Sequence, residues 1–85
     1  MTVRRSRFLA VLVPHWRALR LVPWSISARV CRDIDAGAPL DARLLLADQL
    51  RAAAEHLRHL GGEAEAASFR ALADLIPVAK EEPHA

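Results

Sequence analysis

Two glycines in the second half of the chain, Gly61 and Gly62, place the strongest limit on its fold, because they separate two stretches of helical periodicity. Before the glycines, apolar residues recur at steps of three and four, which places them on one face of a helix. These residues are Leu46, Leu50, Ala53, Leu57 and Leu60. Glycine adopts the left-handed backbone conformation that ends a helix at little cost. The pattern therefore predicts a helical hairpin over residues 38–76, with this first apolar stripe in the core.

The ends of both hairpin helices carry matching signals. Pro39 suits the first turn of the first helix, and Asp41 places a negative charge near the positive end of its dipole. Glu63 and Glu65 supply first-turn acids for the second helix, which ends before Pro77. Its predicted core face consists of Phe69, Leu72 and Ile76, together with Ala64, Ala67 and Ala71 as small residues that permit close helix approach.

A third helix is predicted over residues 24–36. Ile26, Val30 and Ile34 are spaced four residues apart, as expected for one helix face. Pro23 suits an early helical position, and Gly37 is the expected terminating residue.

The first 22 residues allow two interpretations. Phe8, Leu9 and Leu12, followed by Trp16, Leu19 and Val22, fit two short helical pieces that are broken at Pro14. Alternatively, residues 11–13 form an extended segment, since three apolar residues in a row suit a strand as well. The polar tail, residues 80–85, is expected to fray.

Length and composition complete the expected architecture. A chain of 85 residues has room for one compact core, and 53% of its residues are hydrophobic. We therefore predict an all-α fold, a small three- to four-helix bundle built around the C-terminal helical hairpin, with one domain over residues 1–79. Cys31 is the only cysteine and has no partner for an intramolecular disulfide, so a reducing, cytoplasmic location is expected.

Charge is divided sharply along the chain. The first 32 residues contain seven arginines and neither Asp nor Glu, whereas residues 33–85 contain ten acidic and five basic residues. Such asymmetry indicates contact with an acidic protein surface, nucleic acid or an anionic membrane. The alternative is that the basic segment packs against the acidic hairpin of its own chain or of a second copy, which makes a homodimer one expected arrangement.

These features favour a protein-binding module, such as an adaptor, regulator or inhibitor, that docks on an acidic protein surface. The candidate partner-binding residues are Arg4, Arg5, Arg7, Trp16, Arg17, Arg20 and Trp24. Aromatic and arginine side chains are the usual anchors at such contacts. An alternative function is nucleic-acid binding, in which the same arginines contact phosphates. The helical spacing of both tryptophans with other apolar residues, however, favours their use in the core.

A helix-turn-helix DNA reader and an enzyme are both disfavoured. The helix that follows Gly37 opens with apolar residues and Asp41, whereas a recognition helix needs basic and amide side chains at its start. His56 and His59 are close in sequence to Glu55 and Glu63, but a solvated face is favoured over a metal site. Cys31 is expected to be buried as a small hydrophobic residue. We therefore expect no catalytic activity, metal or cofactor.

Targeting signals are weak. The apolar run over residues 8–13 is too short for an export signal, and no stretch approaches the twenty apolar residues that a membrane span needs. The Arg-rich start also fits an organellar transit peptide, which stays an alternative interpretation of the same residues.

Overall fold

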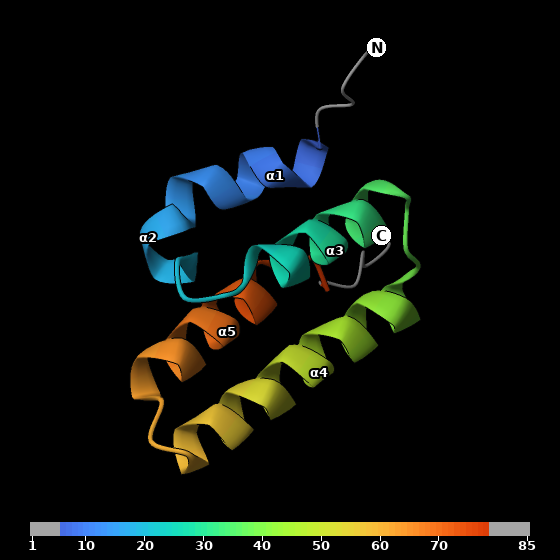
Figure 1. The fold of residues 1–85 in the computed structure, drawn as a ribbon. Coiled ribbons are helices and arrows are strands. Elements are labelled where there is room, and N and C mark those ends of the chain that lie inside the picture. The colour runs from blue at the N-terminus through green and yellow to red at the C-terminus, as the bar shows by residue number, and fades with distance from the viewer. Residues whose placement is uncertain (1–5, 79–85) are drawn as a thin grey trace, which may run out of the picture.

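The computed structural model describes residues 6–78, which contain helices and no strand. In order, the elements are α1 (Arg7–Leu12), the 3₁₀-helix η1 (Val13–His15), α2 (Trp16–Leu19), α3 (Trp24–Asp35), α4 (Leu40–His59) and α5 (Glu63–Leu75). Helices α4 and α5 lie side by side and run antiparallel, while α1 and α2 pack on α5 and α3 packs on α1 (Figure 1). The predicted all-α bundle with a C-terminal hairpin is therefore confirmed. The polar tail predicted to fray lies outside the described residues.

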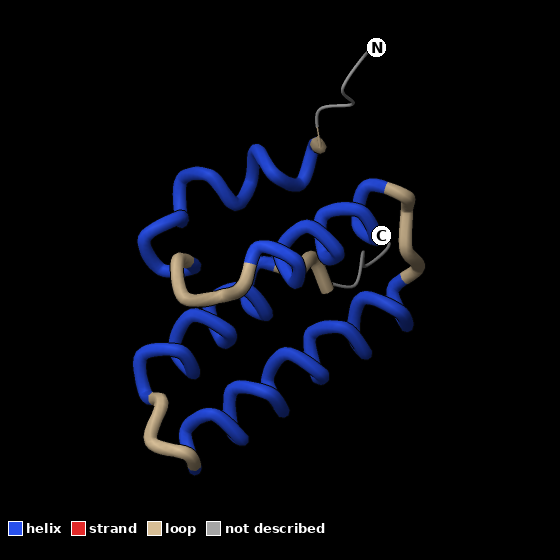
Figure 2. Tube along the Cα trace, viewed as in Figure 1, coloured by secondary structure: helices blue, strands red, loops and turns tan. Residues whose placement is uncertain are grey.

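Glycine ends α3 and α4 as predicted. Gly61 has φ +88°, its N–H bonds to the carbonyl of Arg58, and the N–H of Gly62 bonds to the carbonyl of Leu57. This pair of hydrogen bonds is the Schellman motif, in which a left-handed residue closes the helix. Gly37 has φ +84° and ends α3 with an equivalent pair of bonds. The connections that follow these glycines are short (Figure 2). Gly62 has φ −89° and precedes α5, so the hairpin uses one left-handed glycine.

The core is built on α5, because this helix contacts α1, α2 and α4. Phe69, Leu72 and Ile76 are buried, as their spacing predicted. Of the predicted small residues of α5, Ala71 is half-buried against the core, whereas Ala64 and Ala67 are exposed, so the prediction was wrong for those two. The alanines that permit the close approach of α4 and α5 are Ala47, Ala54, Ala66 and Ala73, each at most 1% exposed. They lie where one helix faces the other, and periodicity alone did not separate this face from its neighbour.

One member of the predicted α4 stripe is also outside the core. Leu50 is buried and Leu46, Ala53 and Leu57 are half-buried against the core, whereas Leu60 is 71% exposed. Leu60 is the C-cap residue of α4, where the chain already turns toward α5. The stripe therefore runs past the end of the surface that the neighbouring helices cover.

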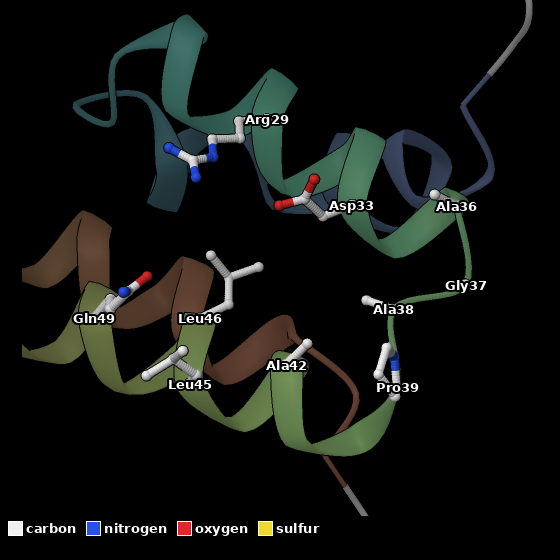
Figure 3. A pocket seen from close by; sticks show the side chains of 10 residues that line it. All are labelled: Arg29, Asp33, Ala36, Gly37, Ala38, Pro39, Ala42, Leu45, Leu46 and Gln49. Carbon is white, nitrogen blue, oxygen red and sulfur yellow. The ribbon is translucent and has the colours of Figure 1, made fainter.

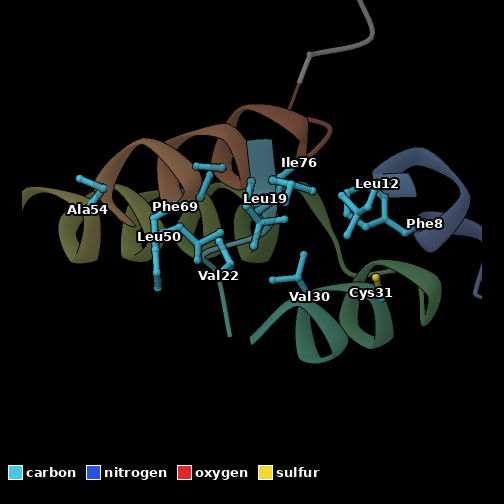
Figure 4. Packing of buried hydrophobic residues seen from close by; sticks show 14 residues of the cluster. Phe8, Leu12, Leu19, Val22, Val30, Cys31, Leu50, Ala54, Phe69 and Ile76 are labelled. Atoms are coloured by element: carbon cyan, nitrogen blue, oxygen red, sulfur yellow. The ribbon is translucent and has the colours of Figure 1, made fainter. Parts of the chain in front are cut away.

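The N-terminal segment is helical almost throughout. The two short helical pieces predicted on either side of Pro14 are present as α1 and α2, and the 3₁₀-helix η1, which contains Pro14, interrupts the α-helix between them. The alternative of an extended segment over residues 11–13 was wrong, since Val13 has helical angles of φ −54° and ψ −44°. Leu19 and Val22 are buried, and α2 packs on α5 (Figure 4). The basic segment thus packs against the hairpin through apolar side chains.

A hydrogen-bonded cap ties α1 to the end of α3. The hydroxyl of Ser6 accepts a hydrogen bond from the N–H of Leu9 at 3.0 Å and donates one to the carboxylate of Asp35. The same carboxylate accepts a hydrogen bond from the N–H of Phe8 at 2.9 Å. These bonds hold the pKa of Asp35 below its ordinary value, with the Ser6 hydroxyl as the largest cause. The first turn of α1 is therefore capped partly by a residue of another helix.

Candidate functional site

The two tryptophans lie on the surface, which corrects the expectation that they belong to the core. The exposed fraction is 60% for Trp16 and 64% for Trp24. Trp16 opens α2, and Trp24 opens α3 directly after Pro23. Each indole exposes a large apolar surface, and exposed apolar surface that forms a contiguous patch marks a candidate contact site.

The exposure of Trp16 follows from the geometry of η1. In an α-helix, Trp16 would share a face with the buried Leu12, which precedes it by four residues. Three residues of 3₁₀-helix turn the chain by about 20° more at each step, so they rotate Trp16 by about 60° away from that face. The residue that enters the core from α2 is instead Leu19. Trp24 is on the same α3 face as Ser27 and Cys31, but its place in the first turn leaves it at the edge of the core.

A groove of about 520 Å³ lies between these tryptophans, and α1, α2 and the start of α3 line it. Leu9 and Leu12 line it from α1, and Leu19 and Ser27 line it from α2 and α3. Among the described residues that line the groove, Arg20 alone carries a charge. Binding grooves for protein side chains and small ligands have this composition, an apolar lining with few polar groups. Hereafter, this groove with its flanking Trp16 and Trp24 is called the tryptophan groove.

Two of the predicted arginines lie at the tryptophan groove. Arg20 lines it, and the guanidinium of Arg17 lies over the ring of Trp16, 5.7 Å from its centroid. This distance is within the range of a cation–π contact, which holds the guanidinium beside the indole. Both arginines are exposed. The structure therefore brings Trp16, Arg17, Arg20 and Trp24 together on one surface.

The remaining predicted residues are not gathered there. Arg7 opens α1, is exposed and is not part of the groove lining. Arg4 and Arg5 lie outside the described residues. Sequence reasoning missed Leu9 and Val13, which line the groove. A helical plot of α1 alone gives no signal for them, since the groove forms only when α2 and α3 are placed.

The basic segment does not pair its charge with the acidic hairpin within residues 6–78. The ion pairs in this range lie within α4 and α5: Arg51 with Asp74 at 3.0 Å and Arg58 with Glu55 at 2.5 Å. The Nε2 of His59 also lies 3.5 Å from the Glu55 carboxylate. The expectation of intramolecular charge pairing therefore fails for the described arginines before residue 33. Their positive charge stays available at the surface.

His56, His59 and Cys31 are the other residues that the sequence offered as candidates for chemistry. His56 and His59 are exposed, as expected for a solvated face. No three His, Cys, Asp or Glu side chains between residues 6 and 78 are grouped so that they could hold a metal ion. Cys31 is buried as predicted, and burial raises the pKa of its thiol, with the Asp35 carboxylate acting in the same direction and the Ser6 hydrogen bond opposing it. A raised pKa disfavours the reactive thiolate.

Comparison with known proteins gives no relative from which a function can be transferred. No protein-family model matches the chain, and neither curated proteins nor solved structures give a match. In the described residues, no helix combines the length and apolar character needed to cross a lipid bilayer. The tryptophan groove is therefore interpreted from its own geometry and charge.

Proposed function

We propose that this protein is a protein-binding module that docks on an acidic surface of another protein through the tryptophan groove, acting as an adaptor, regulator or inhibitor without catalysis of its own. The observation that carries the proposal is the combination of two exposed tryptophans and an apolar groove in a segment whose charged residues are all arginines. Tryptophan and arginine dominate the binding energy of many protein interfaces.

The chemistry of the groove specifies its occupant. Its apolar lining fits an aliphatic or aromatic side chain, while Arg17 and Arg20 favour carboxylates beside that side chain. An amphipathic helix with acidic residues next to its apolar face presents both groups together. We therefore take such a helix in the partner protein as the ligand.

Nucleic acid is the competing occupant of the same arginines. A single-stranded nucleic acid needs a basic track along its backbone as well as aromatic side chains for stacking. Arg20 is the one charged residue among the described residues that line the groove, so the lining favours an apolar protein side chain over a phosphate backbone.

The proposal also places the protein in the cytoplasm, since its one thiol is buried and needs no oxidising compartment. Imaging of the tagged chain tests this location.

The test uses the emission of Trp16 and Trp24, the only tryptophans of the chain, as a direct reporter of groove occupancy. The probe is a synthetic amphipathic helical peptide with leucines on one face and glutamates beside them, and the control peptide has the same composition in scrambled order. We expect the ordered peptide to bind and to shift the emission to shorter wavelength. Trp16→Ala is expected to weaken binding about 30-fold, as for a hot-spot residue that contributes about 2 kcal/mol.

Matched variants separate the groove from general charge. Arg17→Glu is expected to weaken binding, whereas Arg70→Glu, which changes an exposed arginine of α5, is expected to leave it within a factor of about two. Leu60→Ala is the control for Trp16→Ala, since both remove an exposed apolar side chain from residues of 71% and 60% exposure. Circular dichroism confirms that each variant keeps its helices.

Two results would overturn the proposal. One is binding of neither peptide, or equal binding of both, because the proposed site recognises an ordered apolar face with flanking acids. The other is preferential binding of a single-stranded oligonucleotide with an affinity that falls linearly in the logarithm of salt concentration, which is the signature of phosphate contacts. Size exclusion with absorbance at 260 and 280 nm, at low and high salt, shows whether nucleic acid co-elutes with the protein.

A further inference from the structure

A second hollow lies between the last turns of α3 and the first turns of α4, separate from the tryptophan groove. Its volume is about 490 Å³, and the connection through Gly37 and Pro39 closes one end (Figure 3). α4 packs chiefly on α5, so the side of α4 that faces α3 is left partly open. Ala42 and Leu46 give this hollow an apolar floor, and Figure 3 shows Leu46 pointing from α4 toward α3. We call it the α3–α4 cleft.

Leu45 is an apolar residue of the cleft whose side chain is exposed to solvent. It belongs to the lining, yet it is 59% exposed. The cleft therefore presents an apolar hollow and a protruding leucine on the same surface. A surface that contains both a knob and a hole can match a second copy of itself.

The charges of the cleft can also match those of a second copy. Arg29 and Asp33 both line it and are four residues apart, so they lie one turn from each other on α3. Within residues 6–78, neither takes part in an ion pair. When two copies of α3 meet antiparallel across a two-fold axis, Arg29 of one copy faces Asp33 of the other, and the reverse contact forms by symmetry. The charge pattern is thus its own complement.

We propose that the α3–α4 cleft is the interface of a two-fold homodimer, in which Leu45 of each copy enters the cleft of the other and Arg29 pairs with Asp33 across the axis. The self-complementary charge favours a second copy over an unrelated protein, which would need matching charges of its own. The inference is independent of the proposed function. Its consequence for function is that a dimer presents two tryptophan grooves, so a partner with two acidic helices would bind more tightly through effective concentration.

The experiment measures mass by sedimentation equilibrium and by light scattering after size exclusion, from low micromolar to high micromolar protein. We expect a monomer–dimer equilibrium for the unaltered protein. Leu45→Glu is expected to raise the dimer dissociation constant about a hundredfold, since it introduces an unpaired carboxylate into an apolar contact. Leu60→Glu is the matched control, because Leu60 is also an exposed leucine, at the end of α4, and lies outside the cleft. The Leu60→Glu variant is expected to dimerise like the unaltered protein.

Charge reversal tests the two-fold arrangement directly. Arg29→Asp and Asp33→Arg are each expected to weaken the dimer, because each places like charges opposite one another. The double variant Arg29→Asp with Asp33→Arg is expected to restore it, since the exchanged charges again face their complements across the axis. These exposed and half-buried positions tolerate polar substitution, so this series keeps the test valid if Leu45→Glu fails to fold.

A monomer at every concentration would overturn the proposal. Equal effects of Leu45→Glu and Leu60→Glu, or growth into oligomers larger than a dimer, would do the same, because neither fits a closed two-fold contact at this cleft. Failure of the double charge exchange to restore the dimer would overturn the Arg29–Asp33 arrangement. The peptide titration with Leu45→Glu separates the two proposals, since loss of the dimer leaves the tryptophan groove intact.

Discussion

Replacing Leu72 with alanine tests how much of the free energy of unfolding comes from the interior face of α5. Leu72 is 0% exposed and is one of the two largest fully buried side chains of the described core. The change removes about three methylene-sized groups, worth about 0.8 kcal/mol each, or about 2.4 kcal/mol in transfer free energy. The cavity that remains adds to this cost, so we expect a loss of about 3–4 kcal/mol.

That loss is a large part of the whole stability. A chain of this length has a free energy of unfolding of about 4–13 kcal/mol. The change is measured by urea unfolding followed by circular dichroism, and an unchanged denaturant dependence shows that the unfolded state is unaffected. In thermal unfolding the same loss lowers Tm by about 12–32 °C, at about 4–8 °C per kcal/mol for a domain of this size.

Leu60→Ala is the matched substitution outside the core. Leu60 is 71% exposed at the end of α4, so its loss is expected to change the free energy of unfolding by less than about 0.5 kcal/mol. A cost for Leu60→Ala comparable to that for Leu72→Ala would show that the α4 stripe continues into a packed region at residue 60. A cost below about 1 kcal/mol for Leu72→Ala would refute the assignment of α5 as the centre of the core.

Three further predictions concern the caps and the thiol. The cap bonds lower the pKa of Asp35, so its stabilising contribution is fully present above its ordinary pKa of about 4 and is lost as the pH falls through the lower folded-state value. Asp35→Asn should therefore reduce the dependence of the free energy of unfolding on pH in that acid range. An unchanged pH dependence in urea titrations would contradict this. Gly61→Ala should cost about 1–2 kcal/mol in urea unfolding, because a side chain is strained at φ +88° although the space around it is open. Gly62→Ala, at φ −89°, has no such conformational penalty, but the new side chain meets the Glu65 side chain and the Leu57 carbonyl. An unchanged free energy of unfolding for Gly61→Ala would argue against the left-handed cap. Cys31 should react with a thiol reagent such as dithionitrobenzoate only at the rate of local opening or unfolding, since it is 4% exposed and burial raises the pKa of its thiol. Rapid reaction of the native protein would show that α1 does not cover this thiol.

The hairpin could be predicted from sequence because its signals are local. Gly61 and the acids after it mark a helix end and a helix start within a few residues, and Phe69, Leu72 and Ile76 repeat at helical spacing. Leu60 was misplaced because periodicity says which face a residue lies on but not where the neighbouring helix stops. Among the predicted alanines of α5, Ala64 and Ala67 were misplaced for a related reason, since several faces of that helix carry alanines.

The tryptophan groove could be predicted only in part. The sequence indicated that Trp16, Arg17, Arg20 and Trp24 share a basic segment, but it favoured core positions for the tryptophans. Their exposure depends on the extra rotation in η1 and on the placement of α2 against α5, neither of which a periodic pattern contains. The apolar lining from α1 is likewise a product of tertiary packing.

The cap between α1 and α3 was beyond sequence reasoning, because Ser6 and Asp35 are 29 residues apart. A serine before a short apolar run is a common helix start, but nothing local identifies a distant carboxylate as the second cap. The signal that was present is indirect: Asp35 is an acid in the last turn of a helix, where its charge is unfavourable to that helix.

That unfavourable position makes the two helices depend on each other during folding. At the carboxyl end of α3 the Asp35 charge opposes the helix dipole, while at the amino end of α1 the same charge supports it. The last turn of α3 is therefore stabilised by Asp35 only when α1 is docked, and α1, with six residues, is too short to persist alone. The start of α1 and the end of α3 therefore fold cooperatively. A ligand that pulled α1 away from the core would also loosen the end of α3 at Asp35, which lies twenty-three residues after the end of α1 at Leu12.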